Sequence, residues 1–192
     1  MPRSLFRLAA GTAAGYLFAV RPWHLRWGAE DREVHAAMPG DDLIPHPQHQ
    51  ATRAITIDAP PASVWAWVVR LGGHRPGGPP APGASEEPGT TAQQGLKVGD
   101  VLHGAADGTG HIVEQADPPH TLVLASRGAD ATTTCCISLR DVDGKTRMIF
   151  RVRIRAESTL RGTGYLAMMD VGDFLATRRQ MLTIKERAES AH

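Results

Sequence analysis

The strongest constraint on the fold is a strict alternation of side chains over residues 147–156. Every second residue is apolar, and the positions between them carry mostly arginine, so a strand here buries one face and exposes the other. Antiparallel sheets can have one solvated face, whereas parallel sheets are covered on both. The segment therefore predicts an antiparallel sheet covered on one side only. Its buried face would hold Met148, Phe150, Val152 and Ile154.

The remaining elements predict an α+β domain. A strand over 52–57 leads into a helix that starts near Pro61, because proline is favoured in a first helical turn. A long C-terminal helix follows Gly162, and its apolar stripe is interrupted by Arg178. Turn signals separate the strand-like segments between these helices, which cover 99–103, 111–115, 121–126 and 132–140.

Composition and motifs exclude several classes of function. In the 192 residues, 21 Lys and Arg balance 20 Asp and Glu, which argues against a strongly basic nucleic-acid binder. We find no G-x-S-x-G, H-E-x-x-H or phosphate-loop motif, so we predict no catalytic residue, no metal site and no cofactor. Cys135 and Cys136 are adjacent and should point to opposite faces of a strand, which excludes a CxxC site.

The N-terminal residues 1–22 form an apolar segment in which Arg3 and Arg7 precede an uncharged stretch, Leu8–Val20. A transmembrane helix needs about 20 apolar residues, so the stretch is short for one. Three interpretations stay open: a membrane anchor or peripheral helix, a helix packed on its own domain or on a partner, and a cleaved signal. The expected location is accordingly cytoplasmic, or membrane-associated through residues 4–20.

We divide the rest of the chain into a connecting arm over 23–50, with a short helix, and a folded domain over 51–189. Half of the residues in 72–95 are Gly or Pro, which predicts a long loop inside that domain.

Several local stretches resemble the START, polyketide-cyclase and plant-allergen superfamily, known as SRPBCC. Thr52–Trp65 resembles its opening strand and helix, and Val113–Pro119 resembles its middle hairpin. Gly172–Leu182, with the Arg21–Gly28 stretch ahead of the domain, resembles an actinobacterial-looking subgroup with an apolar N-terminal segment. The resemblance implies a helix-grip fold, in which a curved antiparallel sheet is wrapped around a long C-terminal helix. That superfamily hosts lipid carriers, cyclases and hormone receptors.

The resemblance implies a ligand cavity between the sheet and the C-terminal helix. Arg178 cannot lose its charge, so on an apolar helix face it must reach water, pair with a carboxylate such as Glu157 or Asp170, or meet an anionic ligand. Core packing is the alternative interpretation for the Met and Phe side chains. We predict that the ligand-binding residues are Met148, Phe150, Val152, Phe174, Arg178 and Met181.

The predicted function is non-catalytic binding of a hydrophobic or lipid-like small molecule. One alternative is a polyketide cyclase or dehydratase-like enzyme, which needs at least two polar groups converging in the cavity. Another is a membrane-associated interaction module with a closed cavity. The expected partners are a hydrophobic small molecule or lipid and a membrane surface, but no nucleic acid, and the oligomeric state is unknown.

Overall fold

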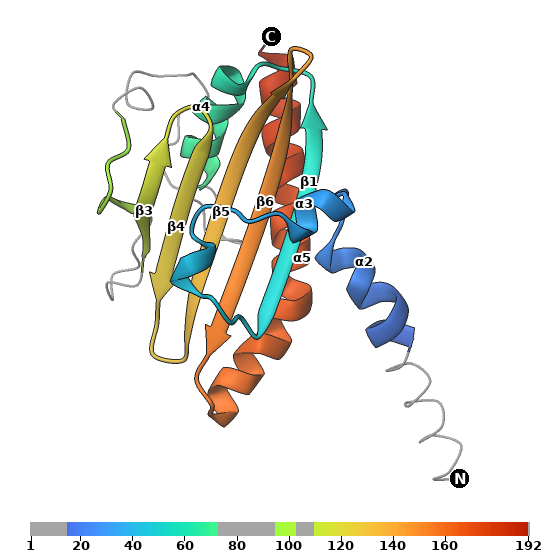
Figure 1. Ribbon diagram of the computed structural model, residues 1–192, viewed down its shortest axis with the longest axis vertical. Helices are drawn as coiled ribbons and strands as arrows, with labels where there is room; N and C mark the ends of the chain where they lie inside the picture. Colours follow the sequence, from blue (N-terminus) through green and yellow to red (C-terminus); the bar gives the residue numbers. More distant parts are fainter. Residues whose placement is uncertain (1–14, 73–94, 103–109, 192) are drawn as a thin grey trace.

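The computed structural model describes residues 15–72, 95–102 and 110–191, and within these ranges six strands form one antiparallel sheet around a long helix (Figure 1). Residues 73–94 of the predicted loop at 72–95 and residues 1–14 of the apolar N-terminal segment lie outside the described residues, and Gly72 is the last residue of a helix. The elements before the sheet are η1 (Tyr16–Val20), α2 (Arg21–Leu25), α3 (Asp31–His35) and η2 (Asp41–Leu43). The others are β1 (His49–Ile57), α4 (Pro61–Gly72), β2 (Val101–Leu102), β3 (His111–Asp117), β4 (Thr121–Arg127), β5 (Ala131–Val142), β6 (Lys145–Ala156) and α5 (Leu160–Ser190).

The strand order is β1-β6-β5-β4-β3-β2, so the first strand pairs with the last. His49 lies opposite Ile154 at one end of that ladder, and Ile57 lies opposite Thr146 at the other. Strands β5 and β6 form a hairpin whose turn residues, Asp143 and Gly144, both have positive φ. The sheet curves around α5 in Figure 1, and the predicted α+β helix-grip fold is confirmed.

The main core lies between the concave face of the sheet and the two helices α4 and α5. The apolar residues of β6 that the alternation singled out point into it, together with Val64 and Val68 of α4. Met181 and Ile184 contribute from α5. The strand and helix periods thus bring the predicted apolar faces together.

The alternation predicts that the opposite, convex face of the sheet is exposed to solvent. Along β1 and β6 this prediction is wrong, because the face is covered. The connecting arm crosses it in Figure 1, and Met38 of the arm packs against Ile149 and Cys136. Cys135 belongs to the main core, so the two cysteines do face opposite sides as predicted. The physical reason for the difference is that this face offers apolar side chains between its arginines, and the arm buries them.

Arg151 fastens the arm to the convex face and is only 2% exposed. It donates five hydrogen bonds, which use every N–H of a guanidinium. Three of them go to the backbone carbonyls of Glu33, Val34 and Ala36 in the arm. The other two acceptors are the Asp41 carboxylate and the Thr52 hydroxyl, at 2.7 Å and 3.0 Å.

A glycine allows the arm to approach the edge of the sheet. The Ala54 amide of β1 donates to the carbonyl of Trp27, and the next residue, Gly28, has φ +69°. A Cβ atom at Gly28 would lie 2.2 Å from the Ala54 carbonyl oxygen. Only glycine fits this contact without displacement of the backbone.

None of the described helices is long and apolar enough to cross a bilayer.

Candidate functional site

Four of the six predicted ligand-binding residues come together in the main core. Met148, Phe150 and Val152 line the concave face of β6, and Met181 lies on the inner face of α5. All four side chains are buried, with Phe150 the most accessible. They form one continuous apolar surface.

The other two predicted residues have different neighbours. The Phe174 ring meets Trp23 edge-on at 5.3 Å and lies 5.4 Å from the ring of His24, so it packs against α2. Arg178 is exposed, and its guanidinium lies 5.1 Å from the centre of the Trp27 ring, where it gains a cation–π contact. A ligand-binding role for the six residues stays a prediction.

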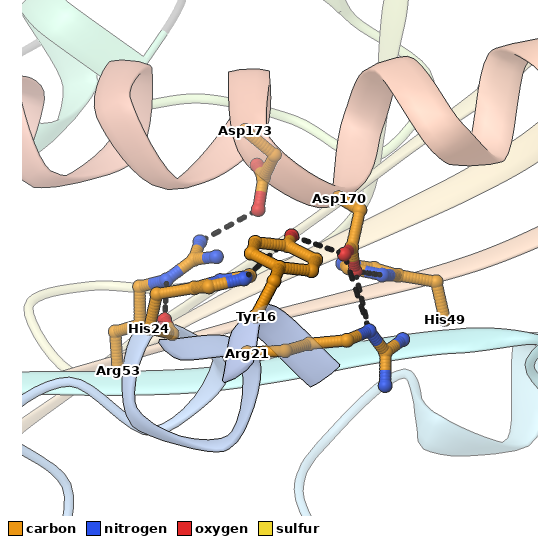
Figure 2. Close-up of polar contacts among 7 residues, drawn as sticks. All are labelled: Tyr16, Arg21, His24, His49, Arg53, Asp170 and Asp173. Carbon is orange, nitrogen blue, oxygen red and sulfur yellow. Dashed lines mark hydrogen bonds and ion pairs between the residues drawn. The ribbon is translucent and has the colours of Figure 1, made fainter. Parts of the chain in front are cut away.

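A cluster of polar side chains, which we call the polar seam, lies where η1 and α2 meet β1 and α5 (Figure 2). None of the sequence patterns described above predicts this cluster. Asp170 and Asp173 reach it from one face of α5, and His49 and Arg53 reach it from β1. The full set is Tyr16, Arg21, His24, His49, Arg53, Asp170 and Asp173.

Asp170 lies at the centre of one half of the polar seam and contacts three of its side chains. Its carboxylate accepts a 2.6 Å hydrogen bond from the Tyr16 hydroxyl and bonds of 3.0 and 3.1 Å from Arg21 Nε. Nδ1 of His49 lies 3.4 Å from Asp170 Oδ1, and the Tyr16 hydroxyl lies 3.1 Å from His24 Nε2. Asp170 thereby joins η1, α2 and β1 to α5.

A buried ion pair forms the other half. Arg53 Nη1 donates to Asp173 Oδ2 at 2.6 Å, and the two side chains are among the most deeply buried charged groups described. Arg53 Nε donates to the His24 carbonyl oxygen, and the Thr177 hydroxyl donates to Asp173 Oδ1. Each charge is therefore compensated within the fold, as burial requires.

The environment sets the protonation of the polar seam. Burial by itself would raise the pKa of Asp170, but the Tyr16 hydrogen bond and the Arg21 charge outweigh it, and the pKa is lowered. Burial lowers the pKa of His24 and of His49, so both imidazoles are neutral at pH 7. Burial, together with the adjacent Asp170, raises the pKa of Tyr16 to about 12.

This arrangement can orient a neutral imidazole, and it holds a helix in place. His49 directs Nδ1 at a carboxylate, and its buried Nε2 atom has no hydrogen-bond partner in the described part of the chain. A carboxylate-oriented imidazole of this kind is the arrangement of a general base. Within the described ranges no three His, Cys, Asp or Glu side chains are grouped to hold a metal ion.

A weak signal for the polar seam was present in the sequence. Asp170 and Asp173 are three residues apart on a helix, and His49 and Arg53 are four apart on a strand, so each pair shares a face. From the sequence alone, Asp170 is expected only as a partner for Arg178, and His49 is expected in the connecting arm. In the structure β1 begins at His49, and Asp170 pairs with Arg21.

A separate open hollow of about 490 Å³ is lined by charged and polar side chains. Its lysines are already engaged: Lys145 pairs with Asp58, and Lys185 pairs with Glu189. A surface hollow of this polarity is unsuited to a hydrophobic ligand.

The strand order and α5 place the chain in the helix-grip class of α+β folds. No family model matches the sequence, and no curated protein matches it. Among solved structures, it is similar to a protein from Arthrobacter aurescens determined by solution NMR, with 17% identity over 82% of this chain and 92% of that chain, and a TM-score of 0.49.

Two further solved structures are similar at the same low level. CalU16 from Micromonospora echinospora has 15% identity over 73% of this chain and 84% of that chain, with a TM-score of 0.40. Ara h 8.0201 has 15% identity over 74% of this chain and 98% of that chain, with a TM-score of 0.42. Values this low carry no inference about activity, and the actinobacterial-looking subgroup stays a prediction.

Proposed function

We propose that the chain binds a hydrophobic or lipid-like small molecule between the concave face of the sheet and α5, without catalysis. The observation that carries the proposal is a set of large apolar side chains that pack against the main core yet remain only half-buried. Accessible apolar surface that continues into a core is the usual lining of a small-molecule site. Among the partly buried side chains packed on this core, those that we assign to the site are Tyr165, Leu166 and Met169 on α5 and Leu96 and Leu102 at the far side of the sheet.

The first turns of α5 face β5. The Tyr165 hydroxyl lies 3.4 Å from the Thr133 hydroxyl, and two residues further along β5 comes Cys135. Cys135 is opposite Val152 of β6, and both belong to the apolar core. A ligand that entered beside Tyr165 would therefore meet an apolar wall, with one pair of hydroxyls at its edge.

Two neighbouring methionines on α5 allow a matched test. Met169 is half-buried against the core, whereas Met168 is exposed on the outer face of the same helix. We expect Met169→Arg to weaken binding of a fluorescent dansyl fatty acid at least about tenfold, because a charge would enter the apolar wall. Met168→Arg should leave the affinity within about twofold, since that position is already in water.

Native mass spectrometry of the purified chain provides a second readout, because a bound lipid would add mass that organic extraction removes. The proposal would be refuted if the fatty acid did not bind, or if the two methionine variants bound it equally well. A cavity of at least about 300 Å³ is expected at this position in the liganded protein.

A cyclase or dehydratase-like enzyme is the second candidate, and the polar seam favours it. That function needs polar groups that meet the ligand, and His49 beside Asp170 offers an oriented neutral base. The imidazole signal of His49 in NMR separates the two candidates. A shift on addition of the fatty acid would place the polar seam at the ligand, whereas an unchanged signal would favour binding alone.

A further inference from the structure

The outer face of α5 carries an apolar stripe that no described element covers. Leu160, Met168, Val171 and Leu175 recur at helical spacing, and all four are exposed. Met168 is 62% exposed and Leu175 is 63% exposed, on the side of the helix opposite the core. A helix of a monomeric domain normally places polar side chains on that side.

The stripe continues onto the neighbouring helical segment, η1 and α2. Trp23 contacts Phe174 edge-on and is still 57% exposed, and Phe18 is 83% exposed. The hydrogen bonds from Tyr16 and Arg21 to Asp170 hold this segment beside α5. We call the outer stripe of α5 together with the exposed side chains of η1 and α2 the docking surface.

On the α5 part of the docking surface, the exposed charges all have the same sign. From Leu160 to Gln180 of α5, the charged side chains classed as exposed are Arg161, Arg178 and Arg179. The two carboxylates in this stretch, Asp170 and Asp173, point into the polar seam, where Arg21 and Arg53 neutralise them. Along this part of α5 the docking surface is therefore apolar and positive.

We propose that the docking surface binds an anionic lipid bilayer, with α5 and α2 lying in the interface and not crossing it. Exposed apolar side chains would enter the headgroup boundary, and Trp23 is of the type enriched there. The arginines beside them would contact lipid phosphates, and each arginine would add a favourable electrostatic attraction to the anionic surface. A second copy of the chain is a poorer occupant, because two such surfaces would bring like charges together.

This inference is independent of the proposed ligand site, which we assign to the inner face of α5. The test uses the full chain and sedimentation with phosphatidylcholine vesicles, either pure or containing about 30% phosphatidylglycerol. The unchanged chain should sediment with the anionic vesicles and not with the neutral ones. Raising NaCl to about 0.5 M should release it, since salt screens the attraction.

The variant Val171→Gln/Leu175→Gln should weaken the partition onto anionic vesicles at least about tenfold, because two apolar side chains are lost from the surface. Both side chains are exposed, so the circular dichroism spectrum and the thermal midpoint should not change. The control is Val142→Gln, which replaces an equally exposed valine at the β5–β6 turn and should bind like the unchanged chain.

The proposal would be overturned by equal partition of the double variant and the unchanged chain, or by equal sedimentation with neutral and anionic vesicles. It would also be overturned by a dimer in solution that Val171→Gln/Leu175→Gln dissociates, because the occupant would then be a second copy. The dansyl fatty acid affinity of the same variant should stay unchanged, which separates this surface from the pocket.

Discussion

Replacement of Arg151 should release the connecting arm from the convex face of the sheet. Arg151→Ala removes all five hydrogen bonds that the guanidinium donates, three of them to backbone carbonyls of the arm. Removal of one partner of a buried charge pair typically costs about 3–5 kcal/mol. The Asp41 carboxylate keeps Arg153 as a partner at 2.7 Å, and the arm carbonyls can turn to water. We therefore expect a loss of about 3–4 kcal/mol in the free energy of unfolding.

The assay is urea unfolding with Arg155→Ala as the control. Arg155 lies on the same strand and the same face but is exposed, so its loss should cost less than about 0.5 kcal/mol. Arg151→Lys separates charge from geometry, because lysine keeps the charge but cannot donate five bonds in a fixed plane. It should lose about 2 kcal/mol or more.

Hydrogen exchange shows where the loss occurs. Amides of residues 29–44 should exchange faster in Arg151→Ala, whereas amides of the β5–β6 hairpin should keep their protection relative to the new stability. Equal stability losses for Arg151→Ala and Arg155→Ala would refute the view that Arg151 holds the arm in place.

Three further predictions concern other parts of the structure. Gly28→Ala should lower the free energy of unfolding by at least about 2 kcal/mol more than Gly144→Ala. Both glycines have positive φ, but only at Gly28 would the added Cβ lie 2.2 Å from a carbonyl oxygen. Chemical denaturation of the two variants compares them, and equal losses would exclude the close contact. Asp173→Asn should cost about 3 kcal/mol or more in thermal or urea unfolding, since it leaves the Arg53 charge buried without its partner; a loss under about 1 kcal/mol would contradict the buried pair. Burial lowers the pKa of His49, so below the unfolded-state pKa of about 6.5 the unfolded chain binds more protons than the folded one, and the free energy of unfolding decreases as the pH is lowered. In urea midpoints measured from pH 7.5 to 5, His49→Gln should therefore show a shallower dependence on pH than the unchanged chain. An unchanged slope would show that His49 does not contribute.

Local sequence patterns were sufficient to predict the sheet and its enclosed helix. The alternation over 147–156 falls inside β6, which spans Lys145–Ala156, because a period of two is a property of the strand itself. The same alternation could not show what covers the convex face. A short arm has no periodicity of its own, and an arginine pattern is the same whether the donors meet water or backbone carbonyls.

The candidate site was predictable only in part, because its contacts join residues far apart in sequence. Met148, Val152 and Met181 meet in the core, as the strand and helix periods require. Phe174 lies seven residues before Met181 on α5, about 10 Å along the helix axis, where its neighbour is α2. The partner of Arg53 lies 120 residues further along the chain. No local pattern specifies such a partner.

The pairing of β1 with β6 fixes the order in which this chain can acquire its structure during synthesis. The β3–β6 meander consists of neighbouring hairpins and can form as its residues leave the ribosome. His49 cannot pair with Ile154 until that residue has been synthesised, and Asp173, the buried partner of Arg53, comes later still, in α5. The first strand and its arm therefore stay without their native partners until most of the chain has been made. A nascent chain of about 150 residues should present both edges of an unfinished sheet to the chaperones that bind there.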